Sequence, residues 1–214
     1  MSEHLYTYDD PPSERDLDKA CSILEKSGVI AYPMDVNWAF GCDASQSKAL
    51  EKIRRLKPSH PKVQPFSLIC ADIAMAANVG NIDHQVYRYL KKAWPGPYTI
   101  IVKRNRSLPR QIKDKRQVVG IRIPKCPMVR ALVERFGKPV ATTSIPLGSD
   151  DEPLKMGYQI FDNYGHAIDL LLDLGEELPG LDSTVIDFTE GYPVLVRKGV
   201  GELEVFGSVM EPED

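Results

Sequence analysis

The fold is decided by residues 29–44, VIAYPMDVNWAFGCDA, in which an apolar segment meets a proline. Proline cannot donate a hydrogen bond to a neighbouring strand, and it favours extended geometry in the residue before it, so we expect a strand over 29–32 that ends at Pro33. The residues after Pro33 then form a site-building loop at the carboxyl edge of the strand, where ligands bind in open α/β sheets. An ordinary connection from strand to helix is the alternative interpretation of the same segment.

Outward from this segment, helical and extended patterns alternate. Apolar residues three and four positions apart predict helices, and short apolar runs bounded by Pro, Gly or Asp predict strands. The predicted helices span 17–24, 46–56, 82–93 and 128–136, the first of them capped by Ser13 and stopped by Gly28. The other predicted strands span 66–70, 98–103, 118–123, 139–143, 168–172, 184–188 and 194–196. With 214 residues the chain is long enough to form one α/β domain with a full core.

Composition narrows the class of protein. A hydrophobic share of 43% and a charged share of 27% are typical of a soluble globular protein. No apolar run reaches the ~20 residues that cross a bilayer, so we expect no membrane partner. The first residues lack the basic and apolar regions of an export signal. The four cysteines have no CxxC spacing, which favours neither a zinc site nor a disulfide framework, and we expect a cytoplasmic protein.

Charge is distributed unevenly along the chain. The net charge of −3 argues against a strongly basic nucleic-acid-binding surface. Basic residues nevertheless gather in two segments: Lys52, Arg54, Arg55, Lys57 and Lys62, and Lys103, Arg104, Arg106, Arg110, Lys113, Lys115 and Arg116. Such faces suit a phosphate-bearing ligand, although a run of charges is also what an ordinary solvated face contains.

Common catalytic and nucleotide-binding motifs are missing from the sequence. It contains no GxxxxGK[ST] loop, no GxGxxG after a strand, no HExxH and no GxSxG. Its four histidines are scattered without metal-ligand spacing.

Eight short blocks occur in an order that resembles the YrdC/YciO family. They are Tyr32-Pro33-x-Asp35 with Gly41-Cys42-Asp43-Ala44, Lys57, Pro65-Phe66-Ser67, Pro95-Gly96-Pro97-Tyr98-Thr99, Gly120-Ile121-Arg122-Ile123-Pro124, Ala141-Thr142-Thr143-Ser144, Ser183-Thr184-Val185-Ile186-Asp187 and Val196-Arg197-Lys198-Gly199. The resemblance implies one YrdC-like α/β domain over residues 10–206, and the acidic composition of the last residues indicates a C-terminal tail over 207–214. It also implies a twisted, mostly parallel sheet with flanking helices around a positively charged cavity.

The resemblance implies an activity as well. Characterised members of the family are threonylcarbamoyl-AMP synthases, which join L-threonine, bicarbonate and ATP, release pyrophosphate, and supply the intermediate for the t6A modification of tRNA. Mg²⁺ is expected as part of the ATP complex, without a tightly bound metal. Adenylation places extra negative charge on the α-phosphate, and fixed cations stabilise that charge.

Matching positions define the expected site. By resemblance, Lys57, Ser144 and Arg197 contact ATP, and Arg122, Ser183 and Thr184 contact the amino acid, with no catalytic residue assigned. Arg122 should point away from the face of its strand that carries Ile121 and Ile123. A solvated lysine at position 57 and a structural salt bridge at Arg122 are the alternatives, and Ser and Thr also cap helices and form turns.

The chain departs from the family pattern at several positions, and Ala39-Phe40-Gly41 stands where synthases have Gly-Leu-Gly. Met34 and Val36 stand where synthases have threonines, and Ser59 and Pro146 stand where they have an arginine and an asparagine. Each lost hydrogen bond to a charged ligand costs ~2–4 kcal/mol. Two hypotheses remain open: a divergent, weak threonylcarbamoyl-AMP synthase, and a non-catalytic protein of the same fold that binds a nucleotide or double-stranded RNA.

Overall fold

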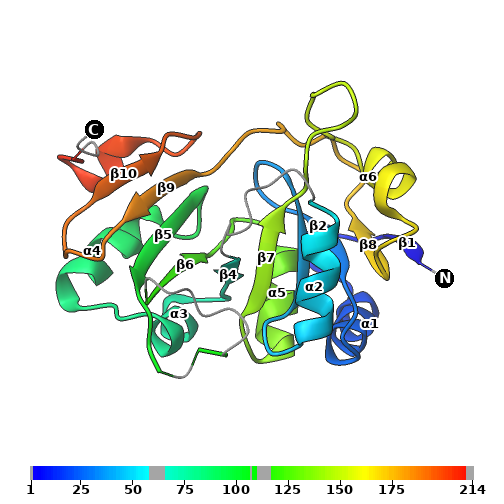
Figure 1. The fold of residues 1–214 in the computed structure, drawn as a ribbon, viewed down its shortest axis with the longest axis horizontal. Helices are drawn as coiled ribbons and strands as arrows, with labels where there is room; N and C mark the ends of the chain where they lie inside the picture. The colour runs from blue at the N-terminus through cyan, green and yellow to red at the C-terminus, as the bar shows by residue number, and fades with distance from the viewer. Residues whose placement is uncertain (1, 58–65, 107, 110–116, 211–214) are drawn as a thin grey trace.

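The computed structural model describes residues 2–57, 66–106, 108–109 and 117–210. Ten strands form one sheet with the order β1-β8-β2-β3-β7-β4-β6-β5-β9-β10 (Figure 1). The strands are β1 (Glu3–Tyr6), β2 (Ile30–Pro33), β3 (Trp38–Asp43), β4 (Ser67–Ile69), β5 (Tyr98–Lys103), β6 (Val118–Arg122), β7 (Val140–Ser144), β8 (Leu170–Asp173), β9 (Thr184–Asp187) and β10 (Val194–Arg197). The helices are α1 (Glu14–Glu25), α2 (Ser47–Arg55), α3 (Ile73–Val79), α4 (His84–Ala93), α5 (Pro127–Phe136), α6 (Gly157–Tyr164) and a 3-10 turn (Leu203–Phe206).

The α/β class is confirmed, and the sheet is mixed rather than mostly parallel. Among the described strands, five neighbouring pairs are antiparallel: β2 with β3, β3 with β7, β4 with β7, β5 with β6, and β9 with β10. The other four pairs are parallel. Short connections between consecutive strands, such as β2 to β3, permit antiparallel pairing, whereas a parallel pair needs a long crossover.

The segment after Pro33 differs from the expected long loop. Pro33 does end β2, but the turn covers only Met34 to Asn37, closed by a hydrogen bond from Met34 N to Asn37 O of 2.9 Å, and β3 follows at once. All six residues of β3 are buried, which is why they form a central strand instead of a surface loop.

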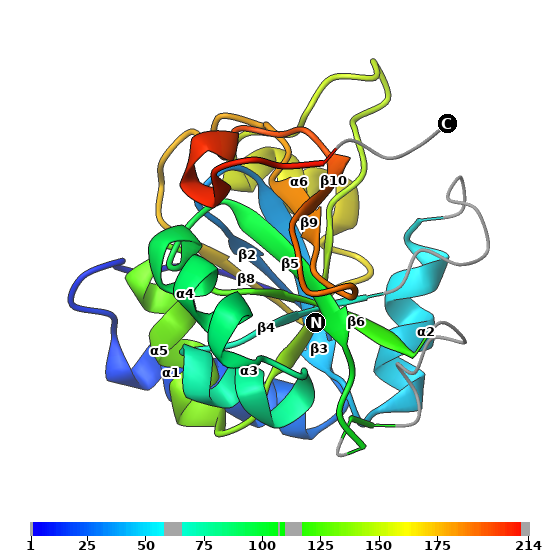
Figure 2. The same ribbon diagram turned by 90° about the vertical axis from the view of Figure 1, so that its left-hand side faces the viewer.

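Helices cover both faces of the sheet. Figure 2 shows α1 and α5 side by side on one flank of the molecule and α2 on the other. Helices α1 and α5 bury Ile30, Tyr32, Ile69 and Val140 in one apolar cluster. Ser13 caps α1 as expected, because its hydroxyl accepts a hydrogen bond from Asp16 N. Sequence patterns did not predict β1, α3 and α6, which have at most eight residues each.

Candidate functional site

A first cavity, of about 460 Å³, lies on one face of the sheet. Its floor is a row of residues in register on four neighbouring strands: Thr142, Ser67, Gly120 and Ile101. Strand alternation turns the adjacent residues Leu68 and Ile121 into the core on the opposite face. Ile69 and Val140 lie on the same face of the sheet as the cavity floor, and α1 and α5 cover that part of the face. The cavity is therefore the part of this face that no described helix covers.

This position corrects the expected one. We expected the site at the carboxyl ends of the strands, and the cavity instead lies over a sheet face whose strands run in both directions. Arg122 and Ser144 end their strands, whereas Ser67 begins one and Ser183 precedes one. In a mixed sheet the carboxyl ends of the strands do not share one edge, so this rule for parallel sheets does not apply.

Glycine at position 120 keeps the floor open. A Cβ atom there would lie 3.1 Å from Ser67 Oγ and 3.4 Å from Thr99 Cγ2, so a larger side chain would fill the cavity. The hydroxyl of Thr99 lies 3.2 Å from that of Ser183, and Tyr32 donates to the Thr142 hydroxyl at 2.8 Å. Six Ser and Thr residues line this cavity: Ser67, Thr99, Thr142, Thr143, Ser144 and Ser183.

Arg122 is a buried cation of the cavity. It is 5% exposed, and its Nη2 lies 2.5 Å from Asp35 Oδ1. Burial lowers the pKa of Arg122, while the charge of Asp35 opposes that shift. Within the described residues, Arg122 Nε and Asp35 Oδ2 are buried without a hydrogen-bond partner. The salt bridge considered from sequence is thus present, and Arg122 also lines the cavity.

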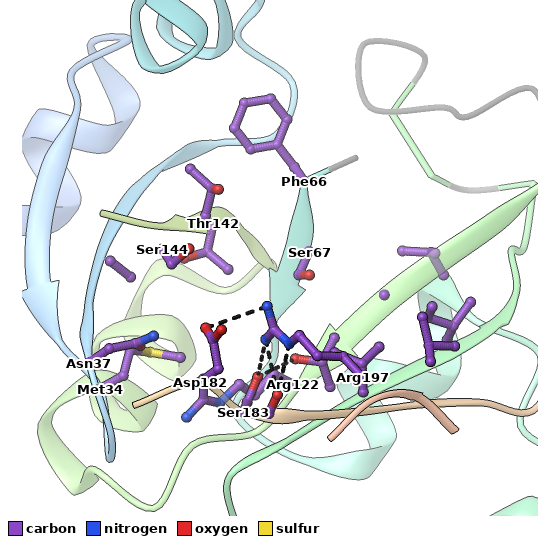
Figure 3. A pocket seen from close by; sticks show the side chains of 18 of the residues that line it. Met34, Asn37, Phe66, Ser67, Arg122, Thr142, Ser144, Asp182, Ser183 and Arg197 are labelled. Atoms are coloured by element: carbon purple, nitrogen blue, oxygen red, sulfur yellow. Dashed lines mark hydrogen bonds and ion pairs between the residues drawn. The ribbon is translucent and has the colours of Figure 1, made fainter. Parts of the chain in front are cut away.

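Arg197 is the second cation, held at the end of β10 by the residues before β9 (Figure 3). Its Nε and Nη2 donate to the carbonyl oxygen of Ser183 at 3.2 and 2.9 Å, and its Nη1 lies 3.4 Å from Asp182 Oδ1. Gly199 permits this close approach, since a Cβ there would lie 2.3 Å from Asp182 O. The Arg197 side chain remains 45% exposed, so part of it is open to a ligand.

Lys57 lies at a second, adjoining cavity of about 1010 Å³. The two cavities share Asn37, Ser144, Asp182 and Arg197. Lys57 follows the carboxyl end of α2, is 9% exposed, and donates from Nζ to Thr143 Oγ1 and Ser144 O, both at 2.8 Å. Burial lowers the pKa of Lys57 to about 8; the charge of Asp182 opposes this shift and that of Arg197 adds to it. Lys57 is therefore not a solvated surface lysine.

The outer wall of the second cavity comes from the connection between β7 and α6, which projects beyond the sheet in Figure 1. Pro146, Leu147 and Asp151 of this connection line the cavity. Apolar side chains of Trp38 and Leu56 line it as well. The second cavity thus combines an apolar wall with the Lys57 amine.

The structure places five of the six predicted contact residues at these cavities: Lys57, Arg122, Ser144, Ser183 and Arg197. Their ligand assignments stay predictions. Thr184 lies elsewhere than expected: it is fully buried, its hydroxyl donates to Gly201 O and accepts from Gly199 N, and it lines neither cavity. Strand alternation, which puts Ser183 in the cavity, turns Thr184 into the core.

Positions that depart from the family pattern fall in different places. Met34 lines the first cavity and Pro146 the second one. Val36 is buried and lines neither, and its carbonyl oxygen instead accepts hydrogen bonds from Gly180 N and Leu181 N. Ser59 lies outside the described residues, as do Lys62, Arg110, Lys113, Lys115 and Arg116 of the basic segments.

Sequence reasoning missed Asn37, Thr99 and Asp182 as lining residues and Asp35 as the partner of Arg122. Asp182 directly precedes Ser183 in the sequence, and Thr99 and Asp35 lie inside two of the blocks that resemble the YrdC/YciO family. Their places beside or within these blocks were the sequence signal that could have identified them. Among the described residues, no group of three or more His, Cys, Asp or Glu side chains could hold a metal ion. Of the helices that the structure describes, none is long and apolar enough to span a membrane.

Comparison with known proteins identifies relatives along nearly the whole chain. The family model Sua5_yciO_yrdC, described as "Telomere recombination", matches residues 22–199. The uncharacterized protein YciO of Escherichia coli strain K12 is 34% identical over 207 residues, which are 96% of this chain and 100% of YciO. The crystal structure of E. coli YciO superposes with a TM-score of 0.89 over the same shares of the two chains.

More distant relatives have named activities. A threonylcarbamoyl-AMP synthase of Pyrococcus abyssi is 28% identical over 192 residues, which are 89% of this chain and 56% of the synthase. The crystal structure of P. abyssi Sua5 complexed with L-threonine superposes with a TM-score of 0.87 at 24% identity, covering 99% of this chain and 63% of Sua5. At that identity the likeness shows a shared fold.

Proposed function

The chain belongs to the Sua5/YciO/YrdC family, and from that premise we propose that it joins an amino acid, bicarbonate and ATP into a carbamoyl adenylate with release of pyrophosphate. The family includes threonylcarbamoyl-AMP synthases, so L-threonine is the first amino acid to test. The product would then be the threonylcarbamoyl-AMP used for the t6A modification of tRNA. Mg²⁺ would enter with the triphosphate as part of the substrate.

The observation that carries this proposal is the arrangement of Arg122, Arg197 and Lys57 around two cavities that share Ser144 and Asp182. Adenylation needs fixed cations where charge develops on the α-phosphate, and it needs the second reactant beside that phosphate. Two adjoining cavities with a cation at their junction meet both needs. Arg197 is that cation, since it lines both cavities.

Cavity size and chemistry favour one assignment of the substrates. The cavity of about 1010 Å³ suits ATP, with Lys57, Ser144 and Arg197 toward the phosphates. The cavity of about 460 Å³ suits the amino acid, with its carboxylate toward Arg122 and Ser183. We assign no ligand to Thr184, because its hydroxyl donates a hydrogen bond to Gly201 O inside the fold.

Pyrophosphate release in the presence of ATP, Mg²⁺, bicarbonate and each amino acid in turn tests the proposal. We expect release that depends on both bicarbonate and the amino acid. Gly120→Val should abolish this release, because its side chain would occupy the floor of the smaller cavity. Gly120→Ala adds a smaller side chain at the same place and should reduce the release less. Absence of amino-acid-dependent release from the native protein would contradict the proposal.

A non-catalytic function of the same site is the second candidate. Met34 and Pro146 line the cavities at positions where synthases have a hydroxyl and an amide, and neither side chain replaces those groups. A protein that only binds would take up ATP or double-stranded RNA in a calorimetric titration and release no pyrophosphate. The same pair of measurements therefore separates the two candidates.

A further inference from the structure

Bicarbonate, the third substrate of the proposed reaction, must lie between the other two. This inference rests on the proposed function, in which the amine of the amino acid bonds to the bicarbonate carbon and the product then attacks the α-phosphate. Bicarbonate therefore has to lie where the cavity assigned to the amino acid meets the cavity assigned to ATP. Four residues line both cavities and mark this junction: Asn37, Ser144, Asp182 and Arg197.

Asn37 brings an unused carboxamide to the junction (Figure 3). Its backbone carbonyl oxygen accepts from Met34 N at 2.9 Å and closes the turn between β2 and β3, so the turn does not need the side chain. In the part of the chain that the structure describes, no hydrogen bond involves the partly buried carboxamide. The carboxamides of Asn105 and Asn163, by comparison, each donate to a backbone carbonyl oxygen at 2.8 Å. The donors and the acceptor of Asn37 are therefore available to a ligand.

A carboxamide matches bicarbonate better than the other three side chains at the junction. Its NH₂ group donates and its oxygen accepts in one plane. Bicarbonate carries an O–H donor beside a C–O acceptor along one edge, so the two planar groups can form two hydrogen bonds at once. The Asp182 carboxylate only accepts, the Arg197 guanidinium only donates, and the single oxygen of the Ser144 hydroxyl cannot span that edge.

Arg197 supplies a positive charge beside Asn37. Its Nε and Nη2 donate to Ser183 O, whereas its Nη1 lies 3.4 Å from Asp182 Oδ1. That distance is longer than the ~2.7–2.9 Å of a strong charge-assisted hydrogen bond, and Nη1 carries two N–H groups. At least one of them is free to donate to an anion at the junction.

We propose that Asn37 is the bicarbonate-binding residue of the site. Its NH₂ group donates to a C–O oxygen of bicarbonate, its oxygen accepts from the bicarbonate hydroxyl, and Arg197 Nη1 donates to the remaining oxygen. The ligand class is a small planar oxyanion that carries one hydrogen-bond donor.

The same contacts suit the product of the carbon–nitrogen step. After the substrate ammonium has lost one proton to solvent, the neutral amine nitrogen bonds to the bicarbonate carbon. The bicarbonate hydroxyl leaves as water with one further proton of that nitrogen, and the carbamate anion remains. The carbamate has an N–H donor beside a C–O oxygen, which is the same edge that bicarbonate presented. Asn37 therefore holds the reactant and the product in one orientation toward the α-phosphate.

Two substitutions at position 37 test the proposal. Asn37→Ala removes both hydrogen bonds, and Asn37→Asp keeps the size of the side chain but replaces the donor with a negative charge. We expect Asn37→Ala to raise the KM for bicarbonate in pyrophosphate release by ~10- to 100-fold, since this is the usual contribution of a hydrogen bond to a charged group. Asn37→Asp should raise it at least as far. The KM values for ATP and the amino acid should stay within about threefold of the native values.

Asn163→Ala is the matched control, because Asn163 lies on α6 and lines neither cavity. We expect native KM values from it. All buffers are freed of dissolved carbon dioxide, which would otherwise supply bicarbonate.

A purely structural role of Asn37 in the turn would give a different result. All three KM values would then rise together, because Met34 and the rest of the turn would move. We expect instead that Asn37→Ala changes the melting temperature by no more than about 2 °C, since its carboxamide has no partner in the described part of the fold. Equal rises in all three KM values, or an unchanged KM for bicarbonate, overturn the inference and leave the proposed function standing.

A second measurement needs no turnover. The protein is loaded with an ATP analogue that has a methylene group between the α- and β-phosphates, and no amino acid is added. The native protein should then broaden the ¹³C resonance of labelled bicarbonate, and Asn37→Ala should broaden it less. Equal broadening by the two proteins, or none by the native protein, overturns the inference. A native protein whose pyrophosphate release depends on neither bicarbonate nor an amino acid overturns the proposed function as well.

Discussion

Arg122 Nη2 lies 2.5 Å from Asp35 Oδ1, and this ion pair joins the end of β6 to the turn after β2. In the sheet order, β3, β7 and β4 separate these two strands. Four steps between neighbouring strands would span ~19 Å in a flat sheet, which is beyond the reach of one arginine. The pair therefore shows that the sheet curves strongly around the cavity, and it holds that curvature.

Removing one member of this pair should destabilise the fold. Arg122→Met leaves the buried Asp35 carboxylate without its cation, and we expect the free energy of unfolding to fall by ~3–5 kcal/mol. The double variant Arg122→Met with Asp35→Leu should lose less than Arg122→Met alone, because no buried charge then remains. Urea-induced unfolding measures all three proteins. A double variant as unstable as the sum of the two single changes would show that the pair has no such role.

The stability contribution of Lys57 should depend on pH. Its pKa is lower in the folded chain, about 8, than the value of about 10.4 in an unfolded chain. Between these values the unfolded chain binds more protons, so stability should rise with pH through that window. Relative to Lys57→Met, the native protein should gain ~1–3 kcal/mol between pH 7 and pH 10, at 1.36 kcal/mol per pKa unit. A difference between the native protein and Lys57→Met that stays flat with pH would contradict the burial of this amine.

Arg197 should matter for ligand binding more than for stability. Its side chain is half exposed, and Arg197→Ala should change the melting temperature little. The same change should weaken ATP binding by ~1–3 kcal/mol, because a charge-assisted contact to phosphate is lost. Arg197→Lys should recover only part of this loss, since lysine cannot form the forked contact. Equal ATP affinity of the native and Ala proteins in a calorimetric titration would remove Arg197 from the nucleotide site.

Met34 should determine how selective the smaller cavity is for threonine, because it lines the cavity assigned to the amino acid. An apolar wall distinguishes similar small amino acids weakly, whereas a wall that hydrogen-bonds a hydroxyl rejects ligands without one. We therefore expect Met34→Thr to raise the preference for threonine over valine in pyrophosphate release, and Pro146→Asn, in the cavity assigned to ATP, to raise the rate without changing that preference. Val36→Thr, which the sequence pattern alone would favour, is the control, because Val36 lines neither cavity. A native preference for threonine of ~100-fold or more would contradict the expectation.

Local sequence patterns predict much of the fold, but they predict only part of the candidate site. Pro33 ends its strand, Ser13 caps its helix, and Arg122 points away from Ile121 and Ile123, all of which depend on neighbours in the sequence. The buried strand β3 could not be distinguished from a loop, because a short, continuous apolar run has no alternation that marks it as a strand.

The sequence patterns could not predict contacts between residues that lie far apart in the chain. The partner of Arg122 is 87 residues away, and the acceptors of Lys57 are 86 and 87 residues away. Strand directions decide such contacts, and an expectation of mostly parallel pairing placed the cavity at the wrong part of the sheet. Burial of Lys57 was likewise hidden, since Arg54 and Arg55 beside it are exposed and give the segment the composition of a surface helix.

The order of strands has a consequence for synthesis on the ribosome. Strands β1 and β2 are near each other in the chain, yet each pairs with β8, which lies between them and is translated much later. Until Leu170–Asp173 emerges, β1 has no partner in the sheet and β2 has an open edge. Arg197 and Gly199 are translated later still, so most strands of the sheet leave the ribosome before the residues that complete the two cavities.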